Sequence, residues 1–104
     1  MDYKTFHSIC LRLPKVTEAT KPDNEQWFLG NGHPFCIVYG KEGTGGVAFQ
    51  VRQNQYNDYI ADDRYKPASL DDQPNWIWVS DFRLLSDEEW DSVIRDALRS
   101  ALSS

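Results

Sequence analysis

The sequence predicts an α+β fold: an antiparallel sheet of about four strands, with the N-terminal and C-terminal helices packed on one face. Three observations predict it. Apolar residues recur at helical spacing near both ends of the chain, apolar and polar residues alternate in the middle, and Asn31-Gly32 joins two alternating segments. A chain of 104 residues with 40% hydrophobic residues suits a single domain, residues 1–104, with one core.

The first element is predicted as a helix over residues 2–13. Its apolar face consists of Tyr3, Phe6, Ile9, Cys10 and Leu13. Asp2 is a suitable N-cap, and Pro14 ends the helix because the residue before a proline avoids the α region. His7 borders the apolar stripe and is interpreted as a packing residue. Residues 14–24 contain two prolines and are predicted to form a loop.

Residues 25–30 and 33–39 are predicted to pair as a hairpin, because Asn-Gly tolerates the positive φ angles of a tight turn. In the second strand, Phe35, Ile37 and Tyr39 are expected on one face and Cys36 and Val38 on the other. The glycine-rich residues 40–46 lead into a strand over 47–52 instead of a helix, which indicates a hairpin loop and argues against a phosphate-binding loop. In that strand, Val47, Phe49 and Val51 should point inward, whereas Ala48, Gln50 and Arg52 should point outward.

A short helix is predicted over residues 54–61, with Asn54 as its cap and an apolar side formed by Tyr56, Tyr59 and Ile60. Residues 62–74 contain two more prolines and are predicted to be a long connection. Loops of this length in small domains are often functional. The segment Arg64-Tyr65-Lys66 therefore becomes a candidate for partner binding.

Residues 75–82 are predicted to be the central strand. Ile77 and Val79 should face the helices, so Trp76 and Trp78 should border the other face, where a binding site is expected. Ser86 and Glu89 then form a capping box that starts a helix running to about residue 102. Its apolar face is formed by Trp90, Val93, Ile94, Ala97, Leu98 and Ala101.

The charge is uneven along the chain. The net charge is −5 and the sequence pI is about 4.8. Residues 1–53 carry six Lys or Arg against five Asp or Glu, and residues 54–104 carry five against eleven. Such an acidic second half repels nucleic acid and anionic membranes unless a local basic patch overrides it.

Compartment and redox state are predicted from what the sequence contains. No apolar run approaches the ~20 residues that span a bilayer, and the polar N-terminus does not resemble a signal peptide. We therefore expect a cytoplasmic protein. Cys10 and Cys36 have no companion spacing and are expected to be small buried side chains in a reducing compartment.

No catalytic, cofactor-binding or metal-binding residue is predicted. His7 and His33 lie on separate elements, and none of the common hydrolase or metalloprotease motifs occurs. The acidic pairs Asp62-Asp63 and Asp71-Asp72 have oxygen ligands that a divalent cation would accept. Solvated loop acids are far commoner than cation sites, so the prediction is a non-enzymatic domain without a metal.

The chain resembles the MmcQ/YjbR family of small bacterial proteins over nearly its whole length. The residues that carry the resemblance are 13–18, the region of Gly32 and Phe35-Cys36, 65–68, 76–79 and 86–89. The resemblance implies a CyaY-like fold, and the family is described as a DNA-binding double-wing fold. It implies no agreed catalytic residues. The acidic balance of this chain departs from what DNA binding favours.

Two functional hypotheses follow. In the preferred one, the domain binds a protein or a small ligand through the sheet face that carries Gln50 and Arg52 beside the tryptophans. The alternative is DNA binding, with phosphate contacts from the cations and base stacking on aromatic rings. The predicted partner-binding residues are Trp27, Arg52, Arg64, Tyr65, Lys66, Trp76 and Trp78, with Lys15 and Lys41 as further cations for DNA. A monomer or weak homodimer is expected.

Overall fold

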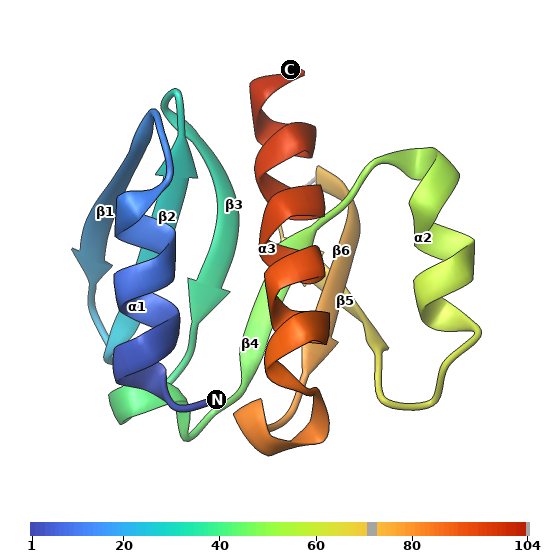
Figure 1. Ribbon diagram of the computed structural model, residues 1–104, viewed down its shortest axis with the longest axis horizontal. Coiled ribbons are helices and arrows are strands. Elements are labelled where there is room, and N and C mark those ends of the chain that lie inside the picture. Colours follow the sequence, from blue (N-terminus) through green and yellow to red (C-terminus); the bar gives the residue numbers. More distant parts are fainter. Residues whose placement is uncertain (71–72, 104) are drawn as a thin grey trace.

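The computed structural model describes residues 1–70 and 73–103, which form three α-helices and one six-stranded antiparallel sheet (Figure 1). The α+β class is confirmed, whereas the prediction of about four strands is wrong. The strand order is β1-β2-β3-β4-β6-β5. The elements are α1 (Tyr3–Arg12), β1 (Val16–Lys21), β2 (Glu25–Gly30), β3 (His33–Val38), β4 (Val47–Gln50), α2 (Gln53–Ile60), β5 (Lys66–Leu70), β6 (Gln73–Val79) and α3 (Asp87–Leu102).

The first missed strand is β1, which lies within the predicted loop over residues 14–24. It pairs with β2 from Val16 opposite Gly30 to Lys21 opposite Glu25. The tight turn between them places both Asp23 and Asn24 at positive φ. The prolines that suggested a loop lie just outside the strand, so they bound it without interrupting its hydrogen bonds.

The second missed strand is β5, within the predicted connection over residues 62–74. It lies at the edge of the sheet and pairs only with β6. Pro67 lacks an N–H group, but an edge strand needs such groups on one side only. The central strand also starts earlier and ends earlier than predicted, at Gln73 and Val79.

The core lies between the sheet and the helices, on what we call the helical side. Figure 1 shows α1 and α3 crossing the same face of the sheet. Phe6 and Cys10 of α1 and the predicted apolar face of α3 are buried there. Ile77 and Val79 lie in this core, as predicted, and Tyr56, Tyr59 and Ile60 of α2 pack against its margin.

Side-chain alternation holds in β4 but not in β3. Val47, Phe49 and Val51 point into the core as predicted. Phe35 was expected beside Ile37, but it lies in the core with Cys36. The β2–β3 register shifts between Phe28, which lies opposite Cys36, and Leu29, which lies opposite Pro34. Phe35 is therefore an inserted residue of β3 with no cross-strand partner in β2. Such a bulge puts two consecutive side chains on one face.

The helix termini largely follow local sequence. The Asp2 carboxylate accepts a hydrogen bond from the Thr5 N–H at 2.9 Å, and Ser86 and Glu89 form the predicted capping box. The prediction of Asn54 as the N-cap is wrong, because α2 starts at Gln53 with Arg52 at the N-cap, and Asn54 lies within the helix. Among the described residues, no helix is long and apolar enough to cross a membrane.

Candidate binding face

The sheet face turned away from the helices carries a second apolar cluster, separate from the core. We call this surface the open face. Its apolar residues are Trp27, Ile37, Tyr39, Ala48, Ala68, Leu70, Trp76 and Trp78. By strand register its polar residues include Lys21, Glu25, Gln50 and Lys66.

One row of side chains on the open face crosses all six strands. Successive cross-strand neighbours in the row are Ala19, Trp27, Ile37, Ala48, Trp78 and Lys66. Cross-strand neighbours have Cβ atoms roughly 5 Å apart, so large indoles fit beside small alanines. The row therefore connects the two edges of the sheet through a nearly continuous apolar surface.

The open face has a buried layer and a partly exposed layer. Ile37, Ala48 and Trp76 are at most 2% exposed, although none of the helices α1, α2 and α3 contributes a residue to this cluster. Trp27, Tyr39 and Trp78 are only partly buried. Trp76 was predicted to contact a partner directly, and its burial shows that this part of the prediction is wrong. Trp76 instead belongs to the buried layer against which the partly exposed rings pack.

Each indole N–H on the open face has a hydrogen-bond acceptor. Trp27 donates to Glu25 Oε1 at 3.0 Å, and the Lys21 ammonium lies 5.3 Å from the centre of its ring. Trp78 donates to the carbonyl of Gly45 at 3.1 Å. These contacts restrict the ring orientations, so a partner would meet preorganised aromatic surfaces.

The glycine-rich loop over residues 40–46 holds Trp78. Gly46 has a φ of +90°, and a Cβ at this position would collide with the Trp78 indole. Close approach of the backbone to an aromatic ring is one of the uses of glycine. The role of this glycine is therefore to seat Trp78, which agrees with the structural interpretation of the loop.

Two of the predicted partner-binding residues lie on the helical side. Arg64 contacts Glu89 Oε2 at 2.6 Å and Asp62 Oδ2 at 2.8 Å, and it donates to the Leu84 carbonyl at 3.1 Å. Tyr65 is 7% exposed and packs in the core against Tyr59. The structure therefore contradicts the idea that Arg64 and Tyr65 extend the open face.

The two other cations predicted to bind a partner, Lys66 and Arg52, lie in different places. Lys66 is exposed and lies opposite Trp78 on the open face. Arg52 was expected to point outward from a strand, but the strand ends at Gln50 and Arg52 is the exposed N-cap of α2. Of the three cations among the predicted partner-binding residues, the structure places only Lys66 on the open face by strand register.

The Arg64 cluster lets us predict a pH effect. Hydrogen bonds from Arg64 lower the pKa of Glu89 to about 2 and also lower the pKa of Asp62. Because the folded pKa of Glu89 is below its ordinary 4.5, the cluster stabilises the fold above about pH 4.5 and loses this effect as the pH falls toward 2. Arg64→Met should therefore lower the melting temperature at neutral pH, with a smaller difference from wild type in acid.

Thermal unfolding at about pH 7 and about pH 2.5 measures this difference. Arg95→Met is a matched control, because Arg95 pairs with Asp91 within the same helix at 2.8 Å and this pair does not join separate elements. We expect a smaller change in the control. An Arg64→Met difference that stays equal at both pH values contradicts the stabilising role assigned to the ionised carboxylates.

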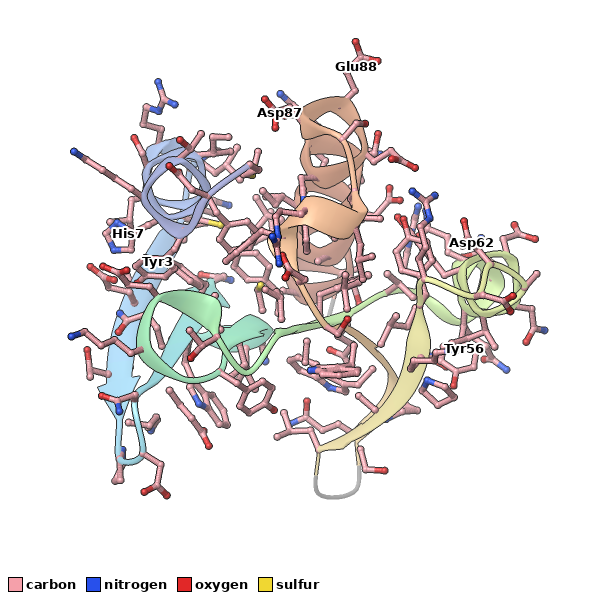
Figure 2. The ribbon with its side chains drawn as sticks, turned by 90° about the horizontal axis from the view of Figure 1, so that it is seen from below. Tyr3, His7, Tyr56, Asp62, Asp87 and Glu88 are labelled. Carbon is pink, nitrogen blue, oxygen red and sulfur yellow. The ribbon has the colours of Figure 1, made fainter. Side chains whose placement is uncertain are left out.

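Several of the described acidic side chains gather on the helical side, near α2 and α3. Two cavities of about 290 and 310 Å³ near α2 and α3 share Tyr59 and Tyr65. Their acidic lining residues are Asp58, Asp62, Glu88, Glu89 and Asp96. Figure 2 shows Asp87 and Glu88 pointing away from the sheet at the start of α3. These described acids of the second half of the chain are thus remote from the open face.

His7 and the two cysteines are held in structural contacts. His7 Nε2 lies 2.8 Å from Glu18 Oε2, and its ring packs against Tyr3 and Phe28. Burial raises the pKa of Cys10 to about 12 and that of Cys36 well above its ordinary value. Both thiols are therefore protonated at neutral pH and weakly nucleophilic.

The acidic pairs considered for a cation have different outcomes. Asp62 is occupied by Arg64, whereas Asp71 and Asp72 lie outside the described residues. Over residues 1–70 and 73–103, no group of three or more His, Cys, Asp or Glu side chains is arranged to hold a metal ion.

Sequence reasoning missed several residues of the open face. Lys21 escaped notice because its segment was interpreted as a loop, and Leu70 for the same reason. Tyr39 was placed correctly beside Ile37, but it was not selected as a site residue. Strand alternation places Glu25 on the same face as Trp27. Lys21 joins this face as the cross-strand partner of Glu25, which requires that the β1–β2 turn is recognised first.

Comparison with known proteins adds no relative. No protein-family model matches the chain, and no curated protein or solved structure matches it. The resemblance to MmcQ/YjbR proteins therefore stays a prediction.

Proposed function

We propose that this protein is a non-enzymatic cytosolic domain that binds a protein partner through its open face. The observation that carries the proposal is the set of three partly exposed rings, Trp27, Tyr39 and Trp78, seated over a buried layer on a sheet. Tryptophan and tyrosine are enriched among the residues that dominate protein–protein affinity. Lys21, Glu25, Gln50 and Lys66 supply the polar groups that usually surround such a centre.

A protein partner suits this surface better than a small ligand. Small ligands bind in concave sites that enclose most of their surface. The cavities near α2 and α3 are on the helical side, and Trp27, Tyr39 and Trp78 line neither of them. A broad apolar row across a sheet instead matches the extended contact that a folded protein or a peptide offers.

The test uses peptides selected for binding to the full chain. Trp27→Ala and Tyr39→Ala should each weaken a selected peptide by about 30-fold if they are hot-spot residues. Tyr56→Ala is the control, because Tyr56 packs against the margin of the core on the helical side. Affinities come from calorimetry, and shifts of the indole N–H resonances locate the contact. Peptides that bind the helical side, or whose affinity is unchanged by both substitutions, would overturn the proposal.

Single-stranded nucleic acid is a second candidate, favoured by the charge distribution. Five of the described acids that argued against it line the cavities on the helical side, whereas Lys21 lies over Trp27 and Lys66 lies opposite Trp78. Aromatic rings beside cations are the usual platform for unpaired bases. This reading also accommodates the DNA binding implied by the family resemblance.

Fluorescence anisotropy with labelled single-stranded and duplex oligonucleotides distinguishes the two candidates. Nucleic-acid binding should weaken steeply with added salt and should be lost when both Lys21 and Lys66 are replaced by alanine. Absence of binding at low salt excludes this candidate and leaves the protein-binding proposal intact.

A further inference from the structure

The outer side of β1 is a row of backbone groups with no neighbouring strand in the described part of the chain (Figure 1). The Asn31 N–H donates to the Lys15 carbonyl at 2.9 Å. In an antiparallel pair, hydrogen-bonded and non-hydrogen-bonded pairs alternate. Thr17, Ala19 and Lys21 therefore bond to β2, and the N–H and C=O groups of Val16, Glu18 and Thr20 point outward.

The two edges of the sheet differ in how they resist further pairing. β5 contains Pro67, and its pairing with β6 shifts between Ala68 and Leu70. Prolines and bulges are devices by which proteins block edge strands. β1 contains neither, and its pairing with β2 is regular over six residues. Additional strand pairing is therefore favoured at β1.

We propose that a second copy of this chain pairs antiparallel with β1, with Ala19 opposite Ala19 of the second copy. Outward-pointing residues must face each other to form hydrogen bonds. A register with Glu18 opposite Glu18 would oppose like charges, which destabilises a pair. In the proposed register, Glu18 lies opposite Thr20 and Thr17 lies opposite Lys21, so no like charges meet.

The proposed register also places the smallest side chain where the strands are closest. The two Ala19 residues form a non-hydrogen-bonded pair, in which Cα atoms are about 4.5 Å apart. Glu18 and Thr20 then exchange backbone hydrogen bonds with Thr20 and Glu18 of the second copy. The strand is thus complementary to itself in both charge and side-chain size.

An exposed leucine next to β1 supports the same partner. Leu11 is one of three exposed large hydrophobic side chains within residues 1–70 and 73–103, and it is 37% exposed. It lies one helical turn after His7, whose ring contacts Glu18 of β1. Residues four apart share a helix face, so Leu11 lies toward the β1 edge, where α1 of the second copy would cover it.

Pairing at β1 would join two open faces, because Ala19 is the cross-strand neighbour of Trp27. One added strand pair and one leucine bury less than the roughly 1,200 Å² of a standard stable interface. We therefore expect a weak dimer whose fraction rises with concentration, between ~10 μM and ~1 mM. The inference does not depend on what the open face binds.

Sedimentation of the full chain over this concentration range tests the proposal. Thr20→Pro removes an outward N–H without removing a bond to β2, and Ala19→Lys places two cations face to face at the closest pair. Both should leave a folded monomer, as judged by circular dichroism. Ser69→Lys is the matched control, because it adds the same charge to exposed Ser69 of the opposite edge and should still dimerise.

Cysteine cross-linking tests the register independently. Ala19→Cys should form an intermolecular disulfide under mild oxidation more readily than Glu18→Cys, since Cys10 and Cys36 are buried and do not compete. A chain that stays monomeric up to ~1 mM overturns the proposal. So does a dimer that tolerates Ala19→Lys, or one that cross-links preferentially through residue 18.

Discussion

Replacing Trp76 by alanine is expected to lower the free energy of unfolding by about 3–5 kcal/mol. Trp76 is 1% exposed, lies between Gln50 and Ala68, and donates its indole N–H to Gln73 at 3.3 Å. Deleting such a ring removes buried apolar surface and leaves a cavity that its neighbours only partly fill. Urea unfolding followed by circular dichroism measures the change.

Trp27→Ala is the matched comparison, because Trp27 lies on the same face but is partly exposed. It should cost much less stability while removing a predicted binding contact. Equal losses for the two variants would contradict the division of the open face into a supporting layer and a contact layer. That division matters for function, since only the contact layer is available to a partner.

Replacing Trp90 by alanine should also cost about 3–5 kcal/mol, and for a different reason. Its ring centre lies 5.5 Å from that of Phe6 and 5.4 Å from that of Phe82. Its indole N–H donates to the carbonyl of Phe82 at 2.8 Å. Trp90 therefore joins α1 and α3 to the turn that follows β6, so its loss should affect all three.

Trp90→Phe separates packing from hydrogen bonding. It keeps an aromatic ring but leaves the Phe82 carbonyl without this donor, which typically costs about 1–3 kcal/mol. Ser92→Ala, at an exposed position of the same helix, should change stability by less than ~0.5 kcal/mol. A Trp90→Phe variant as stable as wild type would show that the hydrogen bond to Phe82 contributes little.

Local sequence patterns predicted much of the fold. The capping box at Ser86, the apolar stripe of α3 and the Asn31-Gly32 turn each depend on residues close together in the chain, so the sequence alone identifies them. The strands β1 and β5 were missed because they are edge strands with mostly exposed side chains. Such strands lack a strong apolar alternation and depend on a neighbour supplied by the fold.

The bulge at Phe35 was missed for a related reason. A strand that alternates regularly in sequence shows no sign that its partner shifts register by one residue. The ion pairs of Arg64 could not be predicted either, because its two carboxylate partners, Asp62 and Glu89, come from different parts of the chain. Only folding brings α3 beside the segment that follows α2, and this contact removes Arg64 from the candidate site.

What the sequence determined by itself is the side of β6 on which each residue lies. Trp76 and Trp78 had to oppose Ile77 and Val79, because side chains alternate along a strand. Tertiary structure decided how exposed each of these side chains is. The strand order places Gln50 and Ala68 on either side of Trp76, which is buried, and it leaves Trp78 partly exposed beside Lys66. Alternation is a property of neighbouring residues, whereas burial depends on strands brought together from distant parts of the chain.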